Sequence, residues 1–565
     1  MKSWIAALAG FVFLLLLVLD PVWGQNQPLV IEGGTLIDGT GRDPIQNSVI
    51  VIEGSRIKAV GTKGNVAYPA GARVIRAEGK TVLPGLIDAH VHLLDFMLPL
   101  FLHYGVTTIF DTANPTEWIL AQREALQRGK MKGPRLFVTG AIIDGPPERS
   151  NPVTFAARAA YRIHTRNAEE ARMATRNLID QGVDGIKVYE GLSTASLKAV
   201  VEEAHQAGLE VVGHAVDARE ATLVGMKFLE HVRPIVHSTL GDPAKVQAVE
   251  EGRLPNSPAE MDTALFGPLI DLLVQNGVYF NPTLTRPRPE SREWYGVVVK
   301  LLEDPSAQFI TAARRESWLG AVKAADTGEN MPQSTESLQK TREFIRRFVQ
   351  AGGKVVTGPD TGPRSSPTNI AGLAMHVEME ALVNAGLTPM QAILASTKWS
   401  AELLRKEKDL GTVEPGKLAD LILIEGDPLA DIRVTQNIRT VILDGKIADT
   451  RLDPNFRNLL PRTFYVDSPL EYVGPEISRM TPGIARAGDA EVTIQVSGKR
   501  FNPRSFLRFD TDDLPTTFLS NSLLTATVDG ALLQNVGTYA VTVVNPGSGG
   551  SPSNVAYFIV NFPPE

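Results

Sequence analysis

The 565-residue sequence contains no cysteine. This absence excludes disulfide bonds, a thiolate nucleophile, thiolate zinc sites and iron–sulfur clusters, so nitrogen and oxygen atoms must hold any metal ion. Basic residues are also in deficit, because 56 Lys and Arg stand against 63 Asp and Glu and give a net charge of −7. A general nucleic-acid binder would show a basic excess, so we expect no nucleic-acid partner.

Long apolar runs are missing after the first residues of the chain. Lys2 precedes an apolar stretch over residues 5–19, which Asp20 ends. This stretch is short of the roughly 20 residues that a spanning helix needs, and it predicts a signal peptide over 1–24 with export to the periplasm or the extracellular space. An uncleaved membrane anchor is the alternative. We expect no stable membrane span once the signal is removed.

The pattern of apolar residues predicts an α/β fold with two flanking all-β regions. Eight short apolar runs alternate with helical stretches, at residues 86–91, 106–111, 135–140, 185–189, 210–214, 227–231, 278–283 and 354–360. Eight such units in a row are typical of a closed (β/α)8 barrel, here over 83–407. A doubly wound open sheet is the alternative, but it would normally have fewer strands and a glycine-rich first turn.

The regions around the barrel alternate in strand fashion. Residues 25–82 and 408–450 flank the barrel, and we expect them to pair into one composite β-sandwich. Residues 286–350 form a long helical insertion, which is either a cap over the barrel mouth or an exposed addition. Residues 451–474 predict a linker. Residues 475–565 contain no histidine and predict a separate immunoglobulin-like sandwich, so the chemistry should lie elsewhere.

Metal-compatible side chains stand at four of the eight predicted strand ends. His90 and His92 lie two apart on the first strand, so both should face the same side. His214, His231 and Asp360 end the fifth, sixth and eighth strands. Each alone is more often a structural residue. Together, at the carboxyl ends of barrel strands, they predict a metal site.

Lys187 lies inside the apolar fourth strand, where a lysine is costly unless it is paired or chemically modified. Its ammonium cannot bind a cation, whereas a carbamate formed with CO₂ would supply two oxygens able to bridge two metals. The alternative is an ion pair with Glu190 or Asp360.

Residues 81–93, His231, Asp360 and residues 411–421 resemble the amidohydrolase superfamily, and within it the imidazolonepropionase-like and prolidase-like metal-dependent hydrolases. The resemblance covers residues 28–450. It implies a distorted TIM barrel with a composite β-sandwich, and one or two divalent metals, commonly zinc. It also implies the following site residues: His90, His92 and Asp360 on one metal, His214 and His231 on the other, carboxylated Lys187 between them, and Asp360 as proton shuttle.

Two segments depart from the pattern of that superfamily. Gly358-Pro359-Asp360 replaces the usual Gly-Thr-Asp, which can change the backbone hydrogen bonds beside the site. Residues 189–192 replace the small-residue run of prolidase-like members, which puts dipeptide specificity in doubt. The C-terminal region, with Pro482, Phe501 and residues 543–547, resembles IPT/TIG immunoglobulin-like domains, which are usually spacers or adhesion modules.

Candidate substrate-binding residues near strand ends are Tyr189, Arg233, His237, Arg149 and Arg364, although each alone is more often structural. We interpret His103, His164 and His205 as structural, and His376 as a residue that could touch the back of the site.

The sequence predicts an exported hydrolase of C–N bonds in cyclic amides, amides or small peptides, with a small-molecule substrate. Asp360 would accept a proton from a metal-activated water and pass it to the leaving nitrogen. A phosphotriester or lactone hydrolase on the same site, and a non-catalytic metal-binding scaffold with an adhesive C-terminal domain, are the alternatives. A homo-oligomer is left open.

Overall fold

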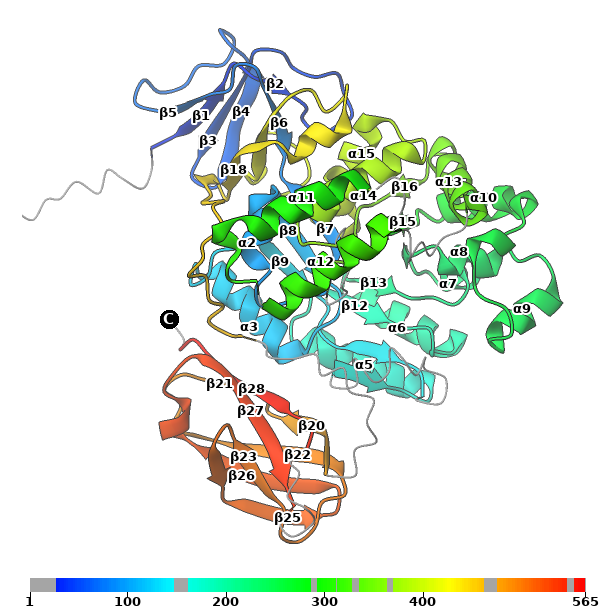
Figure 1. Ribbon diagram of the computed structural model, residues 1–565, viewed down its shortest axis with the longest axis vertical. Coiled ribbons are helices and arrows are strands. Elements are labelled where there is room, and N and C mark those ends of the chain that lie inside the picture. Colours follow the sequence, from blue (N-terminus) through cyan, green and yellow to red (C-terminus); the bar gives the residue numbers. More distant parts are fainter. Residues whose placement is uncertain are drawn as a thin grey trace, which may run out of the picture.

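The computed structural model places a β-sandwich, an α/β barrel and a second β-sandwich along the molecule (Figure 1). It describes residues 27–146, 161–285, 292–310, 312–327, 335–362, 369–461, 475–545 and 553–563. The predicted signal peptide lies outside these residues. Within them, no helix combines the length and apolar character needed to cross a membrane.

The eight predicted barrel strands all form, in three parallel sheets whose order is β7-β8-β9, β11-β10-β12-β13 and β14-β15-β16, where β10 is Ile142–Asp144 and β11 is Arg162–His164. The barrel strands are β7 (Leu86–Val91), β8 (Val106–Asp111), β9 (Arg135–Val138), β12 (Gly185–Val188), β13 (Glu210–Gly213), β14 (Phe228–Glu230), β15 (Tyr279–Asn281) and β16 (Lys354–Val355). Asp184 N donates to Val138 O over 2.7 Å, and a bridge joins Val91 to Thr361, so neighbouring sheets connect. The distorted TIM barrel is confirmed.

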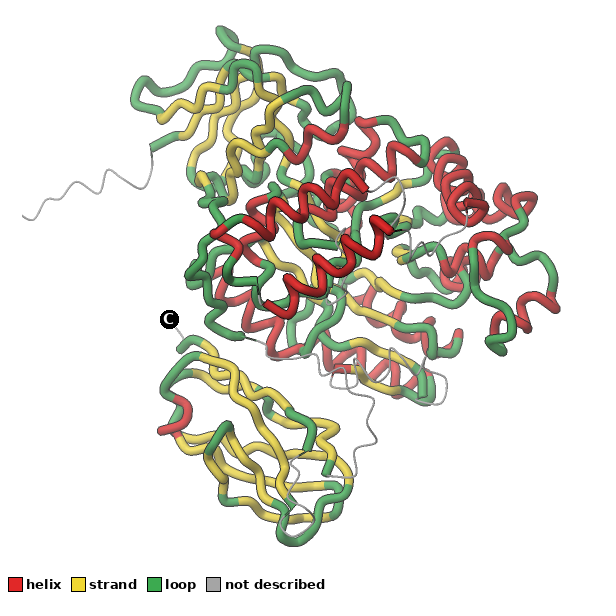
Figure 2. The backbone as a smooth tube through the Cα atoms, viewed as in Figure 1, coloured by secondary structure: helices red, strands yellow, loops and turns green. Residues whose placement is uncertain are grey.

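Helices follow the barrel strands and, except for the helix over Pro243–Glu250, bury side chains (Figure 2). They are α2 (Leu98–His103), α3 (Thr116–Gln127), α5 (Ala168–Asp180), α6 (Thr194–Gln206), α7 (Ala218–Leu223), α8 (Arg233–Ser238), α9 (Pro243–Glu250), α10 (Phe266–Gln275), α13 (Thr335–Gln350), α14 (Leu373–Asn384), α15 (Pro389–Ala395) and α16 (Lys398–Leu403). Side-chain caps explain the starts of several of them. Thr388 and Gln391, for example, form a capping box that satisfies the first amides of α15.

The helical insertion packs on the rim of the barrel near β7. Its helices α11 (Arg292–Glu303) and α12 (Ala312–Thr327) lie across the β7–β9 side in Figure 1. Trp318 is buried with its ring 6.3 Å from Phe96, which lies in the loop after β7. The insertion therefore covers the loop that follows His92.

The two flanks of the barrel pair into one sandwich, as predicted. One sheet holds β1 (Leu29–Glu32), β3 (Ser48–Glu53), β4 (Arg56–Thr62) and β5 (Arg73–Arg76); the other holds β2 (Thr35–Leu36), β6 (Lys80–Pro84), β17 (Leu421–Glu425), β18 (Ile438–Leu443) and β19 (Lys446–Ile447). Strand β6 pairs antiparallel with β17, in the register Leu83 opposite Ile422. Segments more than 300 residues apart in sequence thus share one apolar core.

The C-terminal region is a two-sheet all-β sandwich. Its strands are β20 (Glu476–Thr481), β22 (Glu491–Lys499), β25 (Thr516–Ser520) and β26 (Leu523–Asp529) in one sheet, and β21 (Ile484–Arg486), β23 (Phe506–Phe509), β24 (Asp512–Leu514), β27 (Gly537–Val544) and β28 (Ala556–Asn561) in the other. Arg486 pairs with Glu124 of α3 over 2.8 Å, and Arg128 donates to Pro563 O over 2.7 Å. This sandwich therefore docks directly on the barrel.

Candidate metal centre

A β-bulge near the end of β7 turns His90 and His92 into the barrel. Ile87 and Ala89 pack in the barrel interior, so simple alternation would point His90 outward. Between Asp88 and Val91 the pairing with β8 shifts by one residue, and such a bulge re-aims the following side chains. The two imidazole centroids lie 5.3 Å apart, and both rings are buried.

Asp360 meets these histidines from the end of the eighth barrel unit. Its Oδ1 lies 3.2 Å from His92 Nε2 and 3.6 Å from His90 Nε2. Gly358 lets the chain pass this close, since a Cβ there would lie 2.6 Å from His90 Cβ. Asp360 itself has a φ of 56°, a left-handed conformation that is uncommon outside glycine and clusters at functional sites. We call His90, His92 and Asp360 the closed half of the site.

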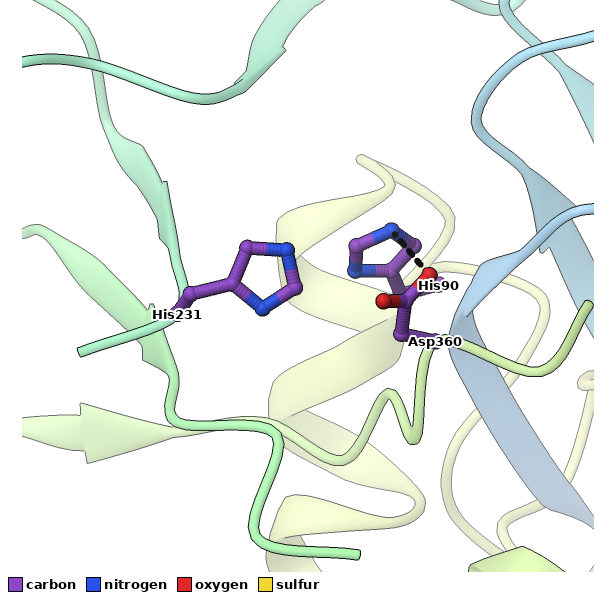
Figure 3. Close-up of side chains that lie close together, drawn as sticks. All are labelled: His90, His231 and Asp360. Atoms are coloured by element: carbon purple, nitrogen blue, oxygen red, sulfur yellow. Dashed lines mark ion pairs between the residues drawn. The ribbon is translucent and has the colours of Figure 1, made fainter. Parts of the chain in front are cut away.

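His214 and His231, the residues that directly follow β13 and β14, face this group, and we call them the open half. Their Nε2 atoms lie 3.0 Å apart, and His231 Nδ1 is 2.9 Å from Thr283 Oγ1. His90 and His231 have ring centroids 5.2 Å apart, and Figure 3 shows His231 facing His90 and Asp360 from the opposite side. Two sets of ligand atoms converge to within 4.8 Å, namely His90, His231 and Asp360, and His214, Glu230 and His231.

His231 points inward because its backbone breaks the strand pattern. Phe228 packs in the barrel interior and Leu229 outside it, so Glu230 faces inward and the next residue should face outward. A φ of 64° at His231 turns the chain, and both Glu230 and His231 reach the site.

Lys187 forms an ion pair with Glu230, and both side chains are fully buried. This contact agrees with the sequence-based alternative of an ion pair, although Glu230 was not among the partners that alternative named. Glu230 lies on the neighbouring side of the barrel interior, with Oε1 3.4 Å from His90 Nδ1 and Oε2 4.0 Å from His214 Nε2. Its carboxylate therefore stands between the closed and open halves.

The donor set fits a divalent cation on two observations. Burial, followed by the charge of Lys187, lowers the pKa of His90 well below its ordinary value of 6.5, so the imidazole is neutral, as a metal ligand must be. His90 Nε2 and Glu230 Oε1 are among the buried polar atoms of the described residues that have no hydrogen-bond partner. Both lie beside other candidate ligand atoms, so a bound cation would give each of them a partner.

Sequence reasoning missed a row of polar residues that begins at Asn281, the last residue of β15, and continues after it. Asn281 Nδ2 donates to Gly358 O over 3.0 Å, and Thr285 Oγ1 donates to Pro359 O over 3.0 Å. These bonds hold the segment that carries Asp360, while Thr283 contacts His231. The two-residue spacing of 281, 283 and 285 is a strand signal that could have revealed them. Glu230 was also missed, although a charge in an apolar strand is the same signal that identified Lys187.

The candidate substrate-binding residues all have protein partners where the structure describes them. Tyr189 is buried and stacks on His214, Arg233 pairs with Glu190 over 3.0 Å, and His237 pairs with Asp217 over 3.1 Å. Arg149 and Arg364 lie outside the described residues.

The remaining histidines have partners away from the site. His376 is buried with Nε2 3.0 Å from Tyr104 O and Nδ1 2.9 Å from Thr435 Oγ1. Its neighbours are thus backbone and hydroxyl groups. His103, His164 and His205 lie beside Thr450 O, Gly145 O and Glu210, in keeping with structural roles.

A sequence profile described as the amidohydrolase family matches residues 81–448. The chain belongs to this family. The match spans the barrel together with the strands of the second flank, and every candidate ligand lies inside it. A divalent metal is general in this family, and the clustered histidine and aspartate side chains agree with it.

Known proteins similar to the chain extend this result. It is 26% identical over 429 residues to an imidazolonepropionase of Shouchella clausii (strain KSM-K16), covering 71% of this chain and 86% of that protein. A crystal structure of a Xaa-Pro dipeptidase with bound methionine in the active site aligns with a TM-score of 0.52 and 25% identity, over 75% of this chain and all of that one. A molinate hydrolase structure, at 23% identity over 75% of this chain and 95% of that one, shares the fold with a TM-score of 0.56.

Proposed function

We propose that this protein is an exported, metal-dependent hydrolase that cleaves C–N bonds in amides, cyclic amides or small peptides. One observation carries the proposal: side chains from β7, β12, β13, β14 and the segment after β16 converge at the carboxyl ends of the barrel strands, in a chain that belongs to the amidohydrolase family. Active sites of such barrels lie at this end.

The residues of the two halves would hold the metal. His90, His92 and Asp360 offer two nitrogens and an oxygen at the closed half, and His214 and His231 offer nitrogens at the open half, a set that suits zinc. A bound cation would supply Lewis-acid chemistry, making a water molecule more acidic and polarising the substrate carbonyl.

Lys187 is proposed to carry a carboxyl group in the loaded enzyme. Its Nζ lies beside the Glu230 carboxylate, which is near both His90 and His214, so a carboxyl group on Nζ would offer oxygen ligands to the site. A carbamate beside Glu230 would place two negative groups together in a buried site, so this arrangement requires cations on both sides.

Asp360 is the proton-transfer residue of the proposed reaction. Its carboxylate accepts a proton from the attacking water as the water oxygen bonds to the carbonyl carbon. It then gives this proton to the nitrogen as the C–N bond breaks, which releases an amine and a carboxylic acid. Asn369 Nδ2 donates to Asp360 O over 2.8 Å and fixes the backbone from which the carboxylate projects.

Asp360→Asn tests this mechanism. Because asparagine keeps an oxygen ligand but cannot carry the proton, we expect turnover to fall by about 10²–10⁴-fold or more while metal content, measured by plasma emission, is retained. Asp409→Asn, which alters a surface pair with Arg56, is the matched control. Full activity in the Asp360 variant would defeat the mechanism.

The substrate class is tested by measuring hydrolysis of a panel of candidate substrates by the purified wild-type protein. The relatives suggest imidazolone propionate and Xaa-Pro dipeptides, to which N-acyl amino acids and cyclic ureas are added. A lactone and a phosphotriester belong in the same panel, because hydrolysis of those alone would contradict C–N cleavage.

Export is tested by N-terminal sequencing of secreted material, which should begin after Gly24.

A further inference from the structure

The turn after β12, residues 189–192, contacts the imidazole of His214 through two side chains. The Tyr189 ring stacks on it, with centroids 4.2 Å apart and planes inclined by 25°. Glu190 Oε2 lies 3.3 Å from His214 Nδ1. The remaining ring nitrogen, Nε2, faces His231 Nε2 at 3.0 Å. One face and one nitrogen of the ring are therefore taken, and the other nitrogen is directed into the site.

The contact with Glu190 selects one tautomer of His214. A neutral imidazole carries a single N–H, and a carboxylate can only accept, so the proton resides on Nδ1. Nε2 is then left with its lone pair. Two imidazole nitrogens 3.0 Å apart require a proton or a cation between them, and the Nδ1–H tautomer makes Nε2 of His214 a ligand.

The turn is held by buried groups that do not depend on His214. Asp144, on the additional strand β10 (Ile142–Asp144), accepts from Gly191 N over 2.9 Å. The other oxygen of Asp144 pairs with Arg162 of β11 (Arg162–His164) over 2.7 Å, and both side chains are almost completely buried. A Cβ on Gly191 would lie 2.6 Å from Asp144 Oδ1, so only glycine allows this approach.

Arg233 completes the arrangement from the open side. Its Nη1 lies 3.0 Å from Glu190 Oε1, and the arginine side chain is 51% exposed. The two oxygens of Glu190 thus have separate partners, one cationic and one the imidazole. This orients the carboxylate toward Nδ1 and compensates its charge in a largely buried position.

We infer that Glu190, together with the Tyr189 ring, is a positioning residue that fixes His214 as an Nε2 metal ligand. The inference rests on the proposed metal site. The extra strands β10 and β11 supply the rigid base from which the turn acts. The segment that departs from the small-residue run of prolidase-like members is the segment that supports the open half.

Zinc affinity of purified full-length variants tests the inference. Titration with Zn²⁺ against a chromogenic chelator should show Glu190→Ala weakened by about 10–100-fold at the open half, with binding at the closed half unchanged. Asp409→Asn, which alters a surface pair with Arg56, is the matched control and should bind like the wild type. Thermal unfolding in excess chelator should show that all three proteins are folded at the temperature of the titration.

A double-mutant cycle separates positioning from a general structural role. If Glu190 acts through His214, Glu190→Ala should have no further effect on zinc affinity in a His214→Ala background. Nitrogen-15 spectra of labelled histidine give a second readout, because the Nδ1–H signal of His214 should be lost or mixed in Glu190→Ala. Additive losses, or unchanged affinity and an unchanged tautomer in Glu190→Ala, would overturn the inference while the proposed function stands. A wild-type protein that binds no zinc would overturn both.

Discussion

The closed and open halves of the metal centre are built in different ways. His90, His92 and Asp360 come from two neighbouring barrel units joined by backbone bonds, such as His92 N to Thr361 O at 2.7 Å. Their side chains are at most 4% exposed, whereas that of His214 is 20% exposed. The closed half is held by the strands themselves, while the open half depends on side chains of a turn and on Thr283.

The closed half is therefore held more rigidly than the open half of the same site. Groups fixed by strand pairing and full burial open only when the barrel opens, whereas partly exposed groups held by side-chain contacts open locally at lower cost. We therefore expect the closed half to retain its cation more tightly. The open half, with Arg233 and His237 nearby, is the side where sequence changes tune the site without loss of the fold.

The largest effect should come from removing one ligand of each half. His90→Ala should lower zinc affinity and activity together. Each should fall by more than the roughly 10–100-fold that is lost when a residue hydrogen-bonded to a metal ligand is removed. His214→Ala should leave one zinc tightly bound. Plasma emission on dialysed protein and kcat/KM on the best substrate measure both. His376→Gln, also fully buried, is the control and should keep its metal; equal losses in the two ligand variants would show that the halves do not act separately.

The next effect concerns the buried pair between the halves. Lys187→Met leaves Glu230 charged and buried without its partner, which should cost about 3–5 kcal/mol in the free energy of unfolding by urea. The partly exposed pair Lys354 and Glu402 provides the control, since Lys354→Met should cost less than about 1 kcal/mol.

Lys187→Arg sharpens the result because arginine keeps the positive charge but cannot form the carbamate. It should preserve the fold and lose zinc, and unchanged zinc content would refute carboxylation.

Much of this arrangement could be predicted from the sequence, because strand ends in a barrel share one rim. The eight apolar runs therefore placed His90, His214, His231 and Asp360 on that rim before any coordinates. The pairing of the flanks was also predictable, since residues 80–84 and 421–425 carry apolar runs that need a partner.

The rest depended on backbone departures that the sequence pattern does not encode. Alternation alone would send either Glu230 or His231 out of the barrel, and only the left-handed φ of His231 brings both inside. The same limit applies to the bulge at His90. Strands β10 and β11 were missed because the first continues β9 after a short break, and the second is only three residues long. Single-sequence periodicity resolves longer elements.

The smallest effect is on the pH dependence of the free energy of unfolding. Two histidines, His376 and His237, should contribute to it with opposite signs. On α14, away from the metal centre, burial lowers the pKa of His376 from 6.5 to about 4. The unfolded chain then binds the extra proton first as the pH falls. Stability from this residue is therefore lost between pH 6.5 and about 4, on the order of 3 kcal/mol.

Near the open half, the hydrogen bond with Asp217 raises the pKa of His237 above 6.5. The folded protein holds that proton longer, so the contribution is fully present below pH 6.5 and is lost as the pH rises through the folded pKa. Urea unfolding of wild type, His376→Gln and His237→Gln across pH 4–9 measures both. We expect the first variant to flatten the acid limb and the second to flatten the alkaline limb. If both variants change stability on the same side of the pH profile, His376 and His237 do not differ in the way that their burial and partners imply.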